Sequence, residues 1–223
     1  MKKKKKLLLV LLLLAAALGI FAYWQRENLS ILVQAGQYTP EELETRLEEN
    51  RQTLQRTLEQ YPELSVREPT EEETQALQSG AITPEELAQT LAEPEKPENP
   101  EADAPSAELS ALIARVLILQ KLYVGRLEAL EEEAKAEYRT MPEEQRKKTE
   151  LVEWASGYVK RATEMERECD AQIDGIVGEM LAVIRDNGGD AELPDKVLYS
   201  YAEEKRLKKA WYLSRLEERG LLK

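Results

Sequence analysis

Residues 106–139 read SAELSALIARVLILQKLYVGRLEALEEEAKAEYR, and their apolar side chains recur at alternating spacings of four and three. The alternation continues without a slip through eight seam positions: Leu109, Ile113, Val116, Gln120, Tyr123, Leu127, Leu130 and Ala134. This pattern is typical of a helix that packs along one side against another helix. At ~1.5 Å per residue such a helix is about 50 Å long.

The stretch that follows predicts a second long helix, with Thr140 as its cap and Pro142 in its first turn. Because the connection is so short, this helix must lie antiparallel to the first. Its seam is Leu151, Ala155, Tyr158, Ala162, Met165, Cys169, Gln172, Ile176 and Met180. The sequence NGG at 187–189 ends it. We expect one of its three glycines to mark a bend or a close crossing: Gly157, Gly175 or Gly178.

A third helix is predicted from Pro194 to about Arg219, and it covers the remaining groove of the hairpin. The residues assigned to this contact are Val197, Leu198, Tyr201, Ala202, Leu207, Ala210 and Trp211. Residues 106–223 are therefore predicted to form a three-helix, coiled-coil-like domain, and the whole chain is predicted to be all-α.

The preceding residues are strongly acidic. Residues 40–104 hold 18 acidic and five basic side chains, and the spacings at Thr39, Thr70 and Thr83 are those of three helix capping boxes. The sequence predicts an acidic helical stalk at 25–92, extended by charge repulsion. Residues 93–105, EPEKPENPEADAP, are rich in proline and glutamate and are predicted to be an extended linker.

The chain begins with a basic tail at residues 1–6 and an uninterrupted apolar stretch from Leu7 to Trp24. The length suits a transmembrane helix, and Tyr23 and Trp24 suit its interfacial end. The lysines before the stretch place the N-terminus in the cytoplasm and the body outside. The alternative is a secretory signal peptide cleaved near Ala17.

Composition excludes several functional classes. The sequence has no histidine, which rules out His-based catalytic triads and His-ligated metal sites. Removing the five N-terminal lysines from the net charge of −12 leaves −17, which disfavours nucleic acid as a partner. Cys169 is interpreted as a buried core residue or as half of an intermolecular disulfide.

Acidic side chains give no metal signature. Glu166, Asp170 and Asp174 lie on one helical face, where pairing with nearby basic residues is the preferred interpretation over Ca²⁺ or Mg²⁺ binding. The segment from Asp186 to Asp190 lacks the spacing of an EF-hand loop and is interpreted as a helix end. No cofactor and no metal are expected.

The candidate contact residues combine large aromatic and basic side chains. Residues 196–223 carry eight positive and four negative side chains, against the acidic trend of the chain. Three interpretations stay open: pairing with acidic helix faces, contact with an anionic polymer or lipid surface, and contact with an acidic protein. The residues singled out as possible partner contacts are Trp154, Lys205, Arg206, Lys208, Lys209, Trp211 and Tyr212.

The sequence predicts a single-pass, membrane-anchored scaffold or adaptor of the cell envelope that is not an enzyme. It contacts lipid through Leu7 to Trp24, and its hairpin contacts a protein partner or a second copy. The alternative is a ligand-binding module, either secreted or membrane-bound, with a pocket between helices lined by Tyr123, Trp154 and Tyr158.

Overall fold

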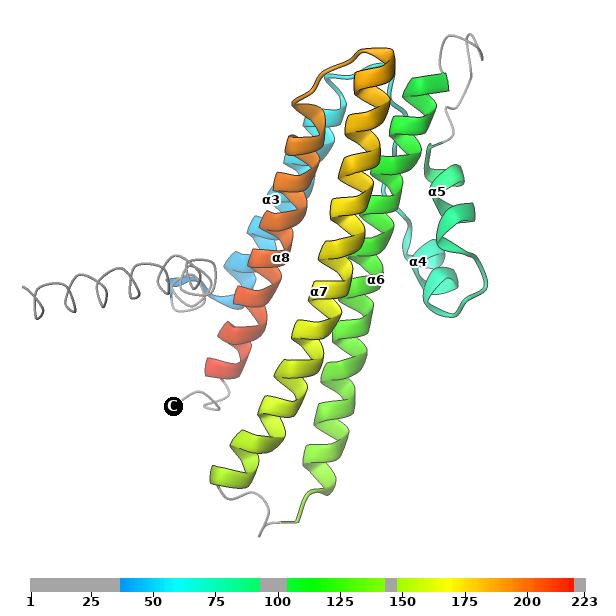
Figure 1. The fold of residues 1–223 in the computed structure, drawn as a ribbon. Helices are drawn as coiled ribbons and strands as arrows, with labels where there is room; N and C mark the ends of the chain where they lie inside the picture. Colours follow the sequence, from blue (N-terminus) through cyan, green and yellow to red (C-terminus); the bar gives the residue numbers. More distant parts are fainter. Residues whose placement is uncertain (1–36, 93–103, 143–147, 219–223) are drawn as a thin grey trace, which may run out of the picture. The chain divides into compact units, whose positions relative to one another are not determined.

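The computed structural model describes residues 37–92, 104–142 and 148–218, and the regular elements among them are all α-helices (Figure 1). The all-α prediction is confirmed. In chain order the helices are α3 (Pro40–Leu58), α4 (Glu71–Gln78), α5 (Pro84–Ala92), α6 (Ala104–Thr140), α7 (Lys148–Asn187) and α8 (Leu193–Glu218). None of these helices is both long enough and apolar enough to cross a membrane, and the predicted anchor Leu7–Trp24 lies outside the described residues.

Capping boxes start α3, α4 and α5 where the sequence predicts them. The Thr39 hydroxyl accepts the Glu42 N–H at 3.2 Å, and the Glu42 carboxylate accepts the Thr39 N–H at 2.9 Å. The same reciprocal pair forms at Thr70 with Glu73 and at Thr83 with Glu86. Each box satisfies N–H groups that the first helical turn leaves without partners.

Helices α6 and α7 lie side by side and bury the predicted seam. Ile113 on α6 and Ile173 and Met180 on α7 are completely buried in one apolar core. The prediction of Gln172 in the seam is wrong: it is exposed, and Ile173 takes its place. A straight helix has 3.6 residues per turn, so a strict 3.5-residue pattern drifts by a position over several heptads.

The predicted end of α7 is confirmed, whereas the predicted boundary at the end of α6 is not. Gly188 has φ of +84°, a conformation that glycine adopts without strain, and α7 ends just before it as predicted. Thr140, expected to start the second helix, is instead the last residue of α6, and its hydroxyl donates to the Glu137 carbonyl at 3.0 Å. The described part of α7 begins at Lys148.

Of the two alternatives predicted for a glycine of α7, a bend or a close crossing, the close crossing is wrong. A Cβ added at Gly157, Gly175 or Gly178 would meet nothing within 4 Å. The tight glycine is Gly125 on α6, where an added Cβ would lie 2.3 Å from the side-chain amide nitrogen of Gln78. Here α4 packs closely against α6.

A second apolar face of α6 is covered by α4 and α5 (Figure 1). Ala114 and Ile118 are completely buried against three leucines, Leu77, Leu87 and Leu91. Helix α6 is thus apolar on two sides, which requires covering elements on both.

The structure differs from the prediction that residues 25–92 form a stalk separate from the hairpin. The described residues form a central unit within Leu54–Tyr201 and a terminal unit of residues 37–53 and 202–218, so that α3 and α8 each contribute to both. In the terminal unit, Leu43 and Leu47 of α3 pack against Leu207 and Ala210 of α8. The leucines of the acidic segment supply enough apolar surface to pack, despite its charge.

Candidate functional site

The hairpin formed by α6 and α7 has two halves with different packing. We call residues 109–127 and 165–184 the inner segment, and residues 128–140 and 153–164 the distal segment. The continuous core belongs to the inner segment, and the partly buried Leu127 and Met165 are among its members nearest the distal segment. Among the described side chains of the distal segment, Leu130 alone is a buried apolar residue.

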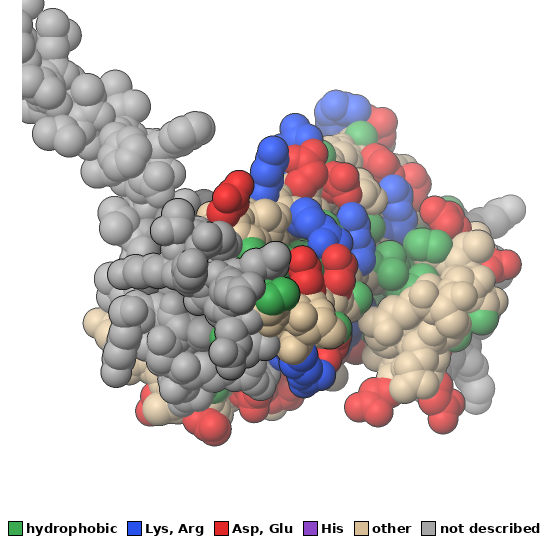
Figure 2. Space-filling view, turned by 90° about the horizontal axis from the view of Figure 1, so that it is seen from below, with side chains coloured by type: hydrophobic (Ala, Val, Ile, Leu, Met, Phe, Trp, Pro, Cys, Tyr) green, Lys and Arg blue, Asp and Glu red, His purple; other side chains and the backbone are tan. Residues whose placement is uncertain are grey.

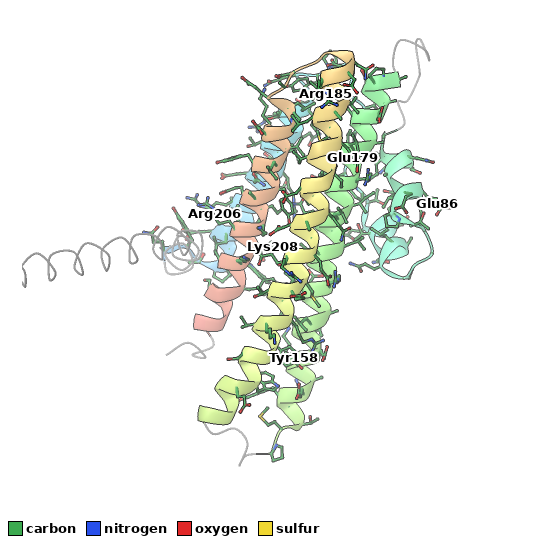
Figure 3. The ribbon with its side chains drawn as sticks, viewed as in Figure 1. Glu86, Tyr158, Glu179, Arg185, Arg206 and Lys208 are labelled. Carbon is green, nitrogen blue, oxygen red and sulfur yellow. The ribbon has the colours of Figure 1, made fainter. Side chains whose placement is uncertain are left out.

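Aromatic rings take the place of that core in the distal segment. Trp154 on α7 lies between Tyr138 of α6, at 5.9 Å between ring centroids, and Tyr158 of α7, at 5.1 Å. Tilted rings at these separations attract one another beyond the effect of their buried area. Figure 3 shows Tyr158 on α7 toward the end of the hairpin that is opposite Arg185.

Charged contacts across the two helices surround these rings. The Arg161 guanidinium donates to both carboxylate oxygens of Glu133 at 2.7 Å and lies over the Tyr158 ring at 5.3 Å from its centroid. The Tyr158 hydroxyl donates to the Glu137 carboxylate at 2.5 Å. Arg161 and Glu133 are both about half exposed, so their pairing adds little stability.

The same contacts set the ionisation states. The hydrogen bond to the Glu137 carboxylate raises the pKa of Tyr158 to about 12. The Arg161 guanidinium lowers the pKa of the Glu133 carboxyl. At neutral pH Tyr158 is protonated and Glu133 is charged, as both groups also are at their ordinary pKa values.

The indole nitrogen of Trp154 is buried, and no hydrogen-bond acceptor for it exists among the described residues. Buried tryptophan N–H groups usually have an acceptor, because leaving a polar group unpaired away from water costs free energy. Val159, five residues or about 1.4 turns further along α7, has 66% of its surface exposed. An unsatisfied donor and an exposed apolar side chain thus occur together on the distal part of α7.

The basic residues singled out in the sequence gather on α8 in the terminal unit (Figure 3). Lys205, Arg206, Lys208 and Lys209 are half-buried. Arg206 pairs with Glu203, one turn earlier, and the Lys208 ammonium lies 5.3 Å from the centroid of the Trp211 ring.

The two aromatic contact candidates of α8 lie beside this cluster. Trp211 packs edge-on against Tyr212 at 5.0 Å, and its indole N–H donates to Glu44 of α3 at 3.1 Å. The structure therefore brings six of the seven candidate residues together on one helix. Trp154 lies on α7, in the central unit.

The aromatic side chains of the predicted ligand pocket do not converge. Tyr123 is buried in the core of the inner segment, whereas Trp154 and Tyr158 pack with Tyr138 in the distal segment. At ~1.5 Å per residue, Tyr123 and Tyr138 are about 22 Å apart along α6. The arrangement gives no support to a pocket lined by all three predicted residues.

A charged cluster that the sequence analysis did not anticipate lies at the loop between α7 and α8. Asp190 accepts hydrogen bonds from the Tyr61 hydroxyl, from Lys196 at 3.2 Å and from the Glu192 N–H at 2.8 Å. These donors, led by Tyr61, lower the pKa of Asp190 to about 2. The loop that superficially suggests calcium binding is thus filled by donors of the protein itself, and within the described residues no group of three or more potential ligands could hold a metal ion.

Comparison of the chain with protein-family models, with curated proteins and with solved structures finds no match. Functional inference therefore rests on the sequence and on the geometry described above.

Proposed function

We propose that this chain is a single-pass, membrane-anchored helical adaptor that acts outside the cytoplasmic membrane by protein contact. Leu7 to Trp24 holds it in the bilayer, Lys2 to Lys6 keep its N-terminus inside, and the α6–α7 hairpin presents the contact surface. Nucleic acid is not proposed as a partner, because the net charge is −12 and Figure 2 shows acidic side chains interspersed with basic ones on the face drawn.

The observation that carries this proposal is the buried, unsatisfied indole N–H of Trp154 in the distal segment. A partner that offers an acceptor to this group, and an apolar surface to Val159 and the neighbouring rings, would complete the local packing. Tryptophan and tyrosine contribute heavily to protein interfaces when they are buried at the centre of a contact. The distal segment is therefore the proposed site of partner binding.

Site-specific photocrosslinking in intact cells tests the contact. A photoreactive residue at Val159, in the distal segment, is expected to crosslink to a partner protein or to a second copy of the chain. The matched control is the same residue at Tyr199, which is 70% exposed but lies near the opposite end of the central unit. Equal crosslinking from both positions would refute a contact specific to the distal segment.

Alkaline extraction of membranes tests the anchor. The full chain is expected to stay in the membrane pellet, and Leu13→Arg is expected to release it, because arginine at the centre of a spanning helix costs about 2.5–3.5 kcal/mol on insertion scales. Gln34→Arg adds the same charge beyond the apolar stretch and should leave extraction unchanged. Recovery of a shortened, soluble chain would support the cleaved-leader alternative instead.

Labelling of an introduced cysteine tests the side of the membrane. In a Cys169→Ser background, a cysteine at the exposed position Ser156 is expected to react with an impermeant maleimide in intact cells. A cysteine that reacts only after lysis would place the body in the cytoplasm and contradict the proposed topology.

A further inference from the structure

The terminal unit has a much smaller apolar core than the central unit. It joins residues 40–53 of α3 to residues 202–218 of α8, and its buried core residues are Leu43, Leu47, Leu207 and Ala210. The two clusters of the central unit hold fifteen and six buried apolar residues. Because apolar burial is the dominant stabilising force, we expect the terminal unit to open more readily than the central unit.

A buried ion pair lies between the two helices of the terminal unit. Glu204 of α8 is 3% exposed and is the only charged side chain among the buried residues of the described chain. Its carboxylate accepts from two nitrogens of Arg51 on α3, from Nε at 3.1 Å and from Nη2 at 2.7 Å. The side chain of Arg51 is 32% exposed.

This ion pair makes the packing of α3 on α8 conditional without making it permanent. A carboxylate that is buried without a partner is strongly destabilising, so α3 can cover Glu204 only in the register that brings Arg51 to it. A buried pair is nevertheless worth little more than two separately hydrated ions, because both lose water on pairing. The pair therefore selects one closed arrangement and still permits α3 to leave.

Two hydrogen bonds join the same two helices. The Trp211 indole N–H donates to Glu44 at 3.1 Å, and the Ser214 hydroxyl donates to the Tyr38 carbonyl at 3.3 Å. Like the ion pair, each of these bonds connects residues at least 153 positions apart in the sequence. None of them forms unless α3 lies against α8, so we expect all of them to break and form together.

We propose that the terminal unit is a conformational switch. In the closed form, residues 40–53 of α3 pack on residues 202–218 of α8; in the open form they have separated in one step, while the central unit stays folded. The Arg51–Glu204 ion pair is the latch that holds the closed form in register.

Opening changes the length of chain that precedes the central unit. From Tyr38 to Leu54 the chain advances 16 residues, which span about 24 Å as a helix and at most about 55 Å when extended. An open switch would thus let the hairpin reach further from the membrane. This consequence rests on the anchor of the proposed function, whereas the switch itself does not, and loss of the anchor in the extraction experiment would remove the effect on reach alone.

Hydrogen exchange of the full chain in detergent micelles, read by mass spectrometry of its peptides, measures the opening. Peptides from residues 43–53 and 202–214 should share one protection factor, at least about ten-fold lower than that of peptides around Ile113 and Ile173. Different protection of the two terminal segments, or protection equal to that of the hairpin core, would overturn the switch.

Removal of the latch separates the terminal unit from the rest of the chain. Arg51→Ala should lower the protection of both terminal segments by at least about ten-fold more and leave the hairpin core unchanged, because it strands the Glu204 carboxylate in the closed form. The matched control is Arg115→Ala in the central unit, which breaks an exposed pair with Glu179 at 2.6 Å and should leave the terminal segments unchanged. An equal loss of protection throughout the Arg51→Ala chain would show one unfolding unit and overturn the switch.

An apolar replacement of the pair tests the role of charge directly. Arg51→Met alone should lower the protection of the terminal segments, as Arg51→Ala does. Adding Glu204→Leu should restore protection to at least the parent level, because no charge then remains to be buried. If Arg51→Met had no effect, or if Glu204→Leu failed to restore protection, Arg51 and Glu204 would not be the latch.

Discussion

The inner and distal segments of the hairpin are built from the same two helices, yet different forces hold them together. The inner segment buries isoleucines and a methionine completely in a continuous core. The distal segment has one buried leucine among its described side chains, together with three packed aromatic rings and charged pairs between the two helices. Apolar burial is the dominant stabilising force, so the inner segment provides stability and the distal segment remains available for contact.

Truncation of one core residue in each segment tests this contrast most strongly. Ile173→Ala should lower the free energy of unfolding by about 3–4 kcal/mol, because it removes buried methyl groups and leaves a cavity. Leu130→Ala should cost less, near about 2 kcal/mol, because fewer neighbours surround it and the site can relax. Urea unfolding followed by circular dichroism measures both values.

The exposed Val159→Ala is the control for these two substitutions and should change stability by less than about 0.5 kcal/mol. If Leu130→Ala proved as costly as Ile173→Ala, the distal segment would be packed as tightly as the inner one, and the contrast would fail.

Glycine substitution tests whether the two segments unfold separately. Gly175→Ala, in the inner segment, should raise global stability by up to about 1 kcal/mol, because the position is open and alanine is the better helix former. Gly157→Ala, equally open but distal, should raise amide protection around residue 157 and change the global transition little. Hydrogen exchange, read peptide by peptide, distinguishes local from global stabilisation.

Gly125→Ala completes this set as a matched control on α6. An added Cβ there lies 2.3 Å from the Gln78 side chain, so Gly125→Ala should raise global stability less than Gly175→Ala does. Equal global gains at Gly157 and Gly175 would mean that the hairpin unfolds as one unit.

The sequence alone predicts those parts of the fold that depend on local chemistry. The end of α7 before Gly188 and the three capping boxes follow from side chains within a few residues of each end. The seam of α6 is also local, because its spacing of four and three repeats along a single helix. These features need no knowledge of distant residues.

The contacts between distant segments were not predictable in the same way. The face of α6 that bears Ala114 and Ile118 is visible as apolar in the sequence, but nothing local says that α5 covers it. The charge of residues 40–92 suggested repulsion, whereas Leu43, Leu87 and Leu91 are completely or almost completely buried. A charge count over a segment does not reveal that its leucines share one side of each helix.

In the candidate site, too, local features were predictable from the sequence and contacts between distant segments were not. The grouping of Lys205, Lys208 and Trp211 on α8 follows from their spacing in the sequence. The position of Trp154 between Tyr138 and Tyr158 depends on the register of α7 against α6, which the 3.5-residue pattern specified only approximately. Its unsatisfied N–H could be recognised only in three dimensions.

The smallest expected effect is a pH dependence confined to the distal segment. The pKa of Tyr158 is about 12 in the folded chain against an ordinary value of 10, because its hydroxyl donates to the Glu137 carboxylate. Folding therefore favours the protonated phenol. The contribution of protonated Tyr158 to the free energy of unfolding is complete below pH 10 and is lost as the pH rises from 10 toward 12.

Difference absorbance of tyrosinate between the parent chain and Tyr158→Phe isolates this titration. In a Glu137→Gln background the acceptor remains but its negative charge is gone, so the Tyr158 midpoint should move back toward pH 10. A midpoint near 10 in both backgrounds would mean that the Tyr158–Glu137 hydrogen bond does not persist in solution. The distal segment would then lack one of the polar contacts that hold Trp154 in place, and an ordered binding surface would have to be created by the partner itself.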